Sequence, residues 1–165
     1  MKNSLAVVLI ATLALPFSAH AQGKPDFSGT WKMDPSRSES AAQSEPLGPV
    51  TIVIAQTANE LRIETTRTQG TSAVTYKLDG SEITIPGGTA TTRWDGTKLV
   101  TEVVRDVQGQ AVTTKETRTL TADGNEMLVE MTLVVQHGYP TTLRGASNYG
   151  AGKDVYVRIH VGAPQ

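Results

Sequence analysis

Two histidines after residue 21, His137 and His160, are the side chains best suited to acid–base or metal chemistry at neutral pH. His137 lies in the turn-like stretch Gln-His-Gly-Tyr-Pro, and neither histidine has a partner at the spacing of a His-Glu-x-x-His metal site. The chain has no cysteine, which excludes thiolate nucleophiles and thiolate metal sites. A Gly-x-Ser-x-Gly elbow and a phosphate-binding loop are also missing. We therefore expect no catalytic residue, no metal and no cofactor, with His137 as a haem or metal ligand the disfavoured alternative.

Carboxylates on different segments are the other possible source of chemistry. Glu102, Glu116 and Glu130 lie on three separate stretches of alternating polar and apolar residues. Two carboxylates that converged could act as an acid and a base. Residues of this kind more often form solvent-facing rows on a sheet, and we expect that arrangement here.

The most polar of these stretches is residues 113–119, Thr-Thr-Lys-Glu-Thr-Arg-Thr. If it is a strand of a barrel, alternate residues face inward, so the interior receives either Lys115 with three threonines or Glu116 and Arg118 with Thr114. One interpretation is a hydrated cavity whose polar groups orient an amphiphilic ligand. The other is a strand at an open seam of the barrel, wet on both faces. Both interpretations stay open at this point.

Large side chains on neighbouring stretches would line such a cavity. Aromatic and methionine side chains on strands are often plain core, but an aromatic ring beside a polar group can also orient a ligand. We predict ligand contacts at Tyr76, Trp94, Arg118 and Tyr156.

The elements that must position these residues are β-strands. Thr and Val dominate after residue 50, and apolar residues recur at every second position. Asp-Gly pairs at 79–80, 95–96 and 123–124 are each flanked by alternating stretches, which is typical of hairpins. The predicted strands are residues 26–33, 50–56, 61–66, 73–78, 82–85, 89–94, 98–105, 111–120, 126–135 and 154–161.

This order predicts an all-β fold, an antiparallel up-and-down β-barrel of about eight to ten strands. A sheet that long must curl or close, which requires the first strand to meet the last. Trp31 on the first strand then packs at the closure, with Phe27 and Met33 on the same face. A two-layer sandwich is the main alternative. An outer-membrane barrel is disfavoured, because residues 113–119 are polar on both faces and aromatic residues make up only 5% of the chain.

The first 21 residues are typical of a secretory signal. Lys2 is followed by an apolar run from Leu5 to Leu15 and by the small-residue end Ala-His-Ala. We expect cleavage after Ala21, which leaves residues 22–165 as a single barrel domain in the periplasm or secreted, with residues 34–49 as a long loop or lid. The net charge of −1 argues against binding to nucleic acid, and we expect a monomer that does not span a membrane.

The stretch Phe27-Ser28-Gly29-Thr30-Trp31 resembles the opening strand of the calycin superfamily, the lipocalins and fatty-acid-binding proteins. The resemblance implies a Gly-x-Trp at the barrel closure and a basic residue across the Trp ring, for which Arg158 is the first candidate and Arg144 the second. The Thr-Asp-Tyr turn of many lipocalins is missing, and so is the Arg-x-Tyr pair that holds a carboxylate in the fatty-acid-binding proteins. The resemblance therefore implies a fold more than a ligand.

From these observations we expect an exported, non-catalytic barrel that binds a small hydrophobic or amphiphilic molecule. The alternative is a protein-interaction or inhibitor-type barrel that uses its outer face or the loop at residues 34–49.

Overall fold

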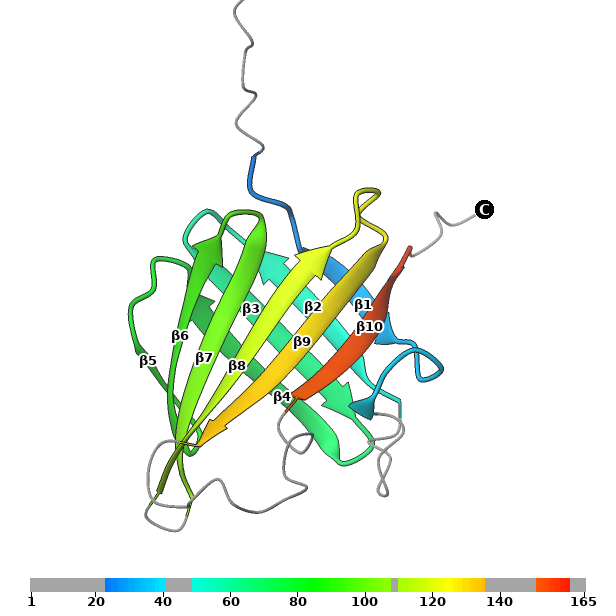
Figure 1. The fold of residues 1–165 in the computed structure, drawn as a ribbon. Helices are drawn as coiled ribbons and strands as arrows, with labels where there is room; N and C mark the ends of the chain where they lie inside the picture. The colour runs from blue at the N-terminus through cyan, green and yellow to red at the C-terminus, as the bar shows by residue number, and fades with distance from the viewer. Residues whose placement is uncertain (1–22, 41–48, 108–109, 136–150, 161–165) are drawn as a thin grey trace, which may run out of the picture.

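The computed structural model describes residues 23–40, 49–107, 110–135 and 151–160. These residues form one antiparallel sheet of ten strands (Figure 1). The strands are β1 (Gly29–Met33), β2 (Thr51–Gln56), β3 (Glu60–Arg67), β4 (Gly70–Lys77), β5 (Ile83–Ile85), β6 (Gly88–Asp95), β7 (Lys98–Val107), β8 (Gln110–Leu120), β9 (Glu126–Val135) and β10 (Ala151–Ile159). Most of them begin and end within a few residues of the predicted strands.

The sheet curls into a nearly closed barrel because its first and last strands pair with each other. The strand order is β4-β3-β2-β1-β10-β9-β8-β7-β6-β5, and Trp31 of β1 lies opposite Arg158 of β10. The two edge strands, β4 and β5, face each other without a hydrogen-bonded ladder. Side chains bridge this gap, since Val74 and Tyr76 of β4 pack against a small cluster that contains Ile85. The predicted antiparallel up-and-down barrel is therefore confirmed.

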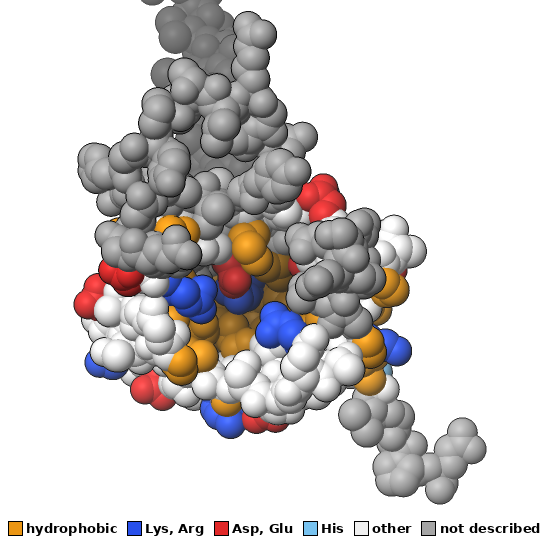
Figure 2. Space-filling view, turned by 90° about the horizontal axis from the view of Figure 1, so that it is seen from below, with side chains coloured by type: hydrophobic (Ala, Val, Ile, Leu, Met, Phe, Trp, Pro, Cys, Tyr) orange, Lys and Arg blue, Asp and Glu red, His pale blue; other side chains and the backbone are white. Residues whose placement is uncertain are grey.

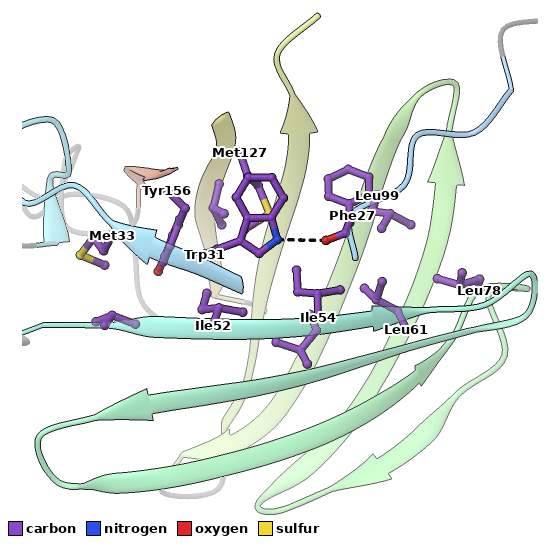
Figure 3. Close-up of a cluster of buried hydrophobic side chains, with 13 residues drawn as sticks. Phe27, Trp31, Met33, Ile52, Ile54, Leu61, Leu78, Leu99, Met127 and Tyr156 are labelled. Atoms are coloured by element: carbon purple, nitrogen blue, oxygen red, sulfur yellow. Dashed lines mark hydrogen bonds between the residues drawn. The ribbon is translucent and has the colours of Figure 1, made fainter. Parts of the chain in front are cut away.

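One end of the barrel, here called the filled end, is closed by apolar side chains. Phe27, Trp31, Leu61, Leu99 and Met127 are fully buried in one cluster (Figure 3). Phe27 belongs to the segment that enters the barrel at this end just before β1 (Figure 1). Because these inward positions come from strands across the whole barrel, they form one contiguous core.

Trp31 and Arg158 hold the closure together. The Trp31 indole donates a hydrogen bond from Nε1 to the Phe27 carbonyl at 2.9 Å. The Arg158 guanidinium lies over the indole, 4.1 Å from its centroid, and donates from Nε to the Gly124 carbonyl at 2.9 Å. A guanidinium over an indole face is a cation–π contact. Arg158 is thus confirmed as the basic residue across the Trp ring, whereas Arg144 lies outside the described residues.

The hairpin predicted at Asp79-Gly80 is wrong. β4 and β5, which this turn connects, lie at opposite edges of the sheet and do not pair. Asp79 accepts hydrogen bonds from the Ser81 backbone N–H and hydroxyl, and it forms an isolated bridge with Arg93 of β6. These contacts hold a turn that separates the two strands instead of joining them.

The loop predicted at residues 34–49 is described at residues 34–40 and at Pro49. Its described part lies along β10, where the Asp34 backbone N–H bonds to the Val155 carbonyl at 2.8 Å and the Ser40 hydroxyl bonds to Asp154 at 2.7 Å. Residues 41–48, the predicted signal at 1–21 and His137 lie outside the described residues, so the lid and the cleavage remain predictions. The described residues include no helix long and apolar enough to cross a membrane.

Replacing Gly29 by alanine tests the closure. Gly29 has a φ of 137°, and a Cβ built there would lie 2.6 Å from Nη1 of Arg158, whose guanidinium is held by backbone carbonyls. We expect Gly29→Ala to lower the free energy of unfolding by about 1–3 kcal/mol in urea titrations. Gly23→Ala is the matched control, because no atom lies within 4 Å of its added Cβ. Equal stability of the two variants would contradict the close packing of Arg158 on β1.

Candidate ligand-binding site

The other end of the barrel, here called the hollow end, is hollowed out among the described residues (Figure 2). Figure 2 shows a depression floored by hydrophobic side chains, with basic and acidic side chains among them. The exposed fraction of the inward-facing side chains of β9 increases from the filled end to the hollow end. Met127 is 0% exposed, Val129 8% and Met131 40%. A large apolar side chain that faces inward and is still exposed indicates that this half of the barrel is not filled by the described residues.

β8 contributes an ion pair to the interior. Arg118 is buried and Glu116 is partly buried, whereas Lys115, which precedes Glu116, is exposed, so the Glu116 and Arg118 parity faces inward. The Arg118 Nη2 donates to a Glu116 carboxylate oxygen. β8 is paired with β7 on one side and β9 on the other, and the gap in the barrel lies between β4 and β5. The alternative of a strand at an open seam is therefore wrong.

Two threonines extend this polar cluster across the sheet. Arg118 Nη1 donates to the Thr101 hydroxyl at 3.2 Å, and the hydroxyls of Thr101 and Thr92 share a hydrogen bond of 3.0 Å. Both threonines are almost fully buried. The guanidinium uses Nη1 and Nη2 in this way, but its Nε–H is buried without a hydrogen-bond partner among the described residues. This Nε atom has almost no exposed surface, so its missing hydrogen bond is a cost to the folded chain and not an open contact for a ligand.

Two tyrosines lie within electrostatic reach of the ion pair. Burial raises the pKa of the Tyr76 phenol, and Arg118 and Glu116 act on it with opposite signs. Burial, with Asp154 as the second cause, raises the pKa of the Tyr156 phenol further. Tyr76 is on β4 and Tyr156 on β10, so the barrel brings both phenols toward β8 from different sides. Arg118 belongs to the interior cluster and the two tyrosines lie within electrostatic reach of it, and ligand contact at all three positions stays a prediction.

Because the phenols of Tyr76 and Tyr156 are buried, we expect the free energy of unfolding to fall in alkali. A folded-state pKa above the usual value means that the folded chain keeps protons that the unfolded chain releases above about pH 10. The stability is therefore fully present below pH 10 and falls as the pH rises from there toward the folded-state pKa. Urea midpoints measured from pH 9 to 11 should fall, and Tyr156→Phe should flatten the fall. An unchanged slope in that variant would show that the Tyr156 phenol is not buried.

Trp94 does not join this cluster. Its ring packs against Phe27 at the filled end, with centroids 6.1 Å apart, and Lys24 lies 5.2 Å from the ring centroid. Trp94 lines a separate shallow pocket with Lys24, Asp26, Gln56, Thr57 and Ala58. The structure does not place Trp94 beside Arg118. That both residues contact the same ligand therefore stays a prediction.

The interior cluster also contains residues that were not predicted as contacts. Glu116, Thr92 and Thr101 are the additional members, and a signal for the threonines is present in the sequence. Thr92 shares the parity of Ala90 and Trp94, and Thr101 that of Leu99 and Val103. A polar residue in the apolar phase of a strand is a candidate for an interior hydrogen bond.

The three glutamates do not converge. Glu102 pairs with Arg93 at 3.3 Å on the outer face, Glu130 is exposed, and only Glu116 faces inward. Among the described residues, no three His, Asp or Glu side chains are grouped so that they could hold a metal ion.

Comparisons with known proteins identify the fold. No protein-family model matches the chain, and no curated protein matches its sequence. Among solved structures, a mutant of the fluorescent protein UnaG matches with 18% identity and a TM-score of 0.54, over 81% of this chain and 96% of that one. Human cRBP IV matches with 17% identity and a TM-score of 0.56, over 82% of this chain and 99% of that one. The chain therefore has the fold of the fatty-acid-binding-protein-like calycin barrels.

Proposed function

We propose that this protein is an exported, non-catalytic carrier or receptor that binds a small hydrophobic or amphiphilic molecule in the hollow end of its barrel. The observation that carries the proposal is the inward-facing Met131, which stays 40% exposed although Met127, on the same face of β9, is fully buried. Apolar walls around a few placed polar groups are typical of small-molecule sites. The likeness of the fold to solved calycin barrels supports a binding role by analogy only.

We propose a non-catalytic role because Glu116 and Arg118, the charged side chains of the interior cluster, are paired with each other. Glu116 accepts a hydrogen bond from Arg118 and so is held as a charged partner. General acid–base catalysis needs groups that can take up and give back a proton, and an arginine guanidinium does not give up its proton in proteins. The ion pair is therefore better suited to orient a ligand than to transfer a proton.

A protein-interaction barrel is the second candidate, and its outer face offers less support. Val53 and Ile159 lie on either side of Thr30 on the outside of the sheet and are 42% and 41% exposed. Val53, Ile159 and the smaller Thr30 between them form a smaller surface than the ~800 Å² per partner of a stable interface. The hollow end is the better supported site.

The test is native mass spectrometry of the protein purified from its own compartment. A chain that begins at Gln22 and carries a bound small molecule, identified after extraction, would support export and binding together. A chain that still contains residues 1–21 would contradict export. A bare chain that also fails to bind added amphiphiles would contradict the binding role and favour a protein partner.

A further inference from the structure

We propose, on the basis of the proposed function, that Met131 is a site of reversible oxidation that regulates ligand binding in the hollow end. A peroxide converts the Met131 thioether into a sulfoxide, and the oxidised protein binds apolar molecules more weakly. The proposal rests on the exposure of Met131 and on its two neighbours across the strands, Glu116 and Gly152.

Met131 differs from the other described methionines in its exposure. The chain contains four methionines and no cysteine, so its sulfur chemistry rests on methionine alone. Among the described residues, Met131 is 40% exposed, whereas Met33 is 5% and Met127 0% exposed. A dissolved oxidant must touch the sulfur atom in order to react with it, so susceptibility follows exposure. Met131 is therefore the first of the three to be oxidised.

The exposure of Met131 has a structural cause in its position on β9. Met131 lies opposite Gly152 of β10, and a Cβ added at Gly152 would find no atom within 4 Å. The space on that side is thus open. On the other side Met131 lies opposite Glu116 of β8, whose carboxylate is bonded to Arg118. Neither of these two residues has a large apolar side chain that could cover the thioether, so the sulfur stays accessible from the hollow end.

The reaction is the transfer of one oxygen atom from hydrogen peroxide to the Met131 sulfur. A lone pair of the sulfur attacks one peroxide oxygen, the O–O bond breaks, and an S–O bond forms. The sulfur is oxidised, and the peroxide is reduced to water because the departing hydroxide takes the proton of the transferred oxygen. Methionine sulfoxide reductases reverse the modification. The chemistry therefore allows a switch between two states.

The product changes the wall of the proposed site. Met131 shares the inward face of β9 with Met127 and Val129, and it is the exposed member of that row. A sulfoxide is polar and accepts hydrogen bonds, and the Glu116 carboxylate opposite it is also an acceptor and has no hydrogen to donate. Water then hydrates the sulfoxide, and an apolar ligand must displace that water at a cost. Oxidation of Met131 therefore weakens the binding of apolar molecules.

The experiment treats the purified protein with hydrogen peroxide and locates the added oxygen by mass spectrometry of its peptides. We expect Met131 to be oxidised about tenfold or more faster than Met33 and Met127. Two probes, Nile red and 1-decanol, are titrated before and after oxidation. The dissociation constant of at least one probe should rise about tenfold, and methionine sulfoxide reductases should restore it.

The outcomes separate this proposal from the proposed function. Equal oxidation rates of the three methionines, or unchanged binding of both probes after Met131 is oxidised, would overturn the proposal but leave the binding function standing. Failure of both probes to bind the untreated protein would overturn both.

The decisive variant is Met131→Leu, because leucine keeps an apolar side chain of similar size but has no sulfur. Its affinity for each probe should be the same before and after peroxide treatment. Met33→Leu is the matched control, since it removes a buried methionine, and its affinity should still fall about tenfold after peroxide. A Met131→Leu protein that loses affinity after peroxide would show that oxidation acts at another residue.

A second variant tests the effect of a polar side chain without any oxidant. Met131→Gln places an uncharged polar group of similar length at this position, so the affinity for the probes should fall about tenfold in the untreated protein. Thr132→Gln is the matched control, because Thr132 is the exposed next residue on the opposite face of β9, and it should keep the affinity of the unmodified protein. Unchanged affinity in Met131→Gln would overturn the regulatory role of Met131.

Discussion

Replacing Trp31 by alanine should lower the free energy of unfolding by about 3–5 kcal/mol. Trp31 is fully buried in the filled end, so the variant leaves a large cavity among Phe27, Met127 and the neighbouring side chains (Figure 3). It also removes the donor to the Phe27 carbonyl. A carbonyl that loses its partner inside a core adds to the cost of the cavity. Urea unfolding followed by circular dichroism measures the loss.

Two further variants separate the contributions of Trp31. Trp31→Phe keeps an aromatic ring but removes the indole N–H, so it should cost about 1–3 kcal/mol, less than the alanine variant. Lys32→Ala is the control, since Lys32 follows Trp31 on β1 and is exposed, and it should change the stability by less than about 0.5 kcal/mol. A loss below about 1 kcal/mol in Trp31→Ala would refute the role of Trp31 at the closure.

The strands could be predicted because the signal for them is local. Met127, Val129 and Met131 are large apolar residues at every second position along β9, and the structure buries the first two on one face. The Asp-Gly pair at 95–96 joins two strands that do pair, because Asp95 of β6 lies opposite Lys98 of β7. Periodicity of two and turn residues are properties of a few neighbouring residues, so a single sequence carries them.

The failed hairpin at Asp79-Gly80 shows where local signals end. The same dipeptide separates β4 from β5, because whether two strands pair depends on how the whole sheet closes. Here the sheet closes at β1 and β10, and the unpaired edges meet at β4 and β5. A turn residue allows a change of direction but does not decide which strand lies alongside.

The candidate site could be predicted only in part, because the face that β8 turns inward also depends on how the strands pair. Threonines occupy both parities of residues 113–119, so the sequence could not decide whether Lys115 or the pair of Glu116 and Arg118 faces inward. The pairing of β8 with β7 decides it, since Arg118 lies opposite the fully buried Leu99. Trp94 was grouped with Arg118 on residue type alone. Which side chains share a pocket depends on strand tilt and on Phe27, and these are not local properties.

Replacing Arg158 by alanine should lower the free energy of unfolding by about 3 kcal/mol. Its guanidinium lies over Trp31 and donates to carbonyls of Asp26, Ser28 and Gly124, which belong to the segment before β1 and to the turn before β9. The variant loses a cation–π contact and several hydrogen bonds from a charged donor at once. Part of the cost is recovered by water, because Arg158 is only partly buried.

Two comparisons make the result specific to the geometry of Arg158. Arg158→Lys keeps the charge but not the planar fork, so it should recover only about a third of the loss. Arg93→Ala is the control, because Arg93 is an exposed arginine with one ion pair to Glu102, and it should cost less than about 1 kcal/mol. If Arg158→Lys were as stable as the unmodified protein, charge alone would explain the effect and the fork geometry would be unnecessary.

A double-mutant cycle then tests whether Arg158 and Trp31 act as one unit. The guanidinium carbon lies 4.1 Å from the centroid of the indole ring, so removing either group takes away part of what the other contributes. The combined variant Trp31→Ala with Arg158→Ala should cost about 0.5–3 kcal/mol less than the sum of the two single losses. Additive losses would mean that the two residues stabilise the closure independently. A measured coupling would instead show that the direct contact between Arg158 and Trp31 stabilises the pairing of β1 with β10.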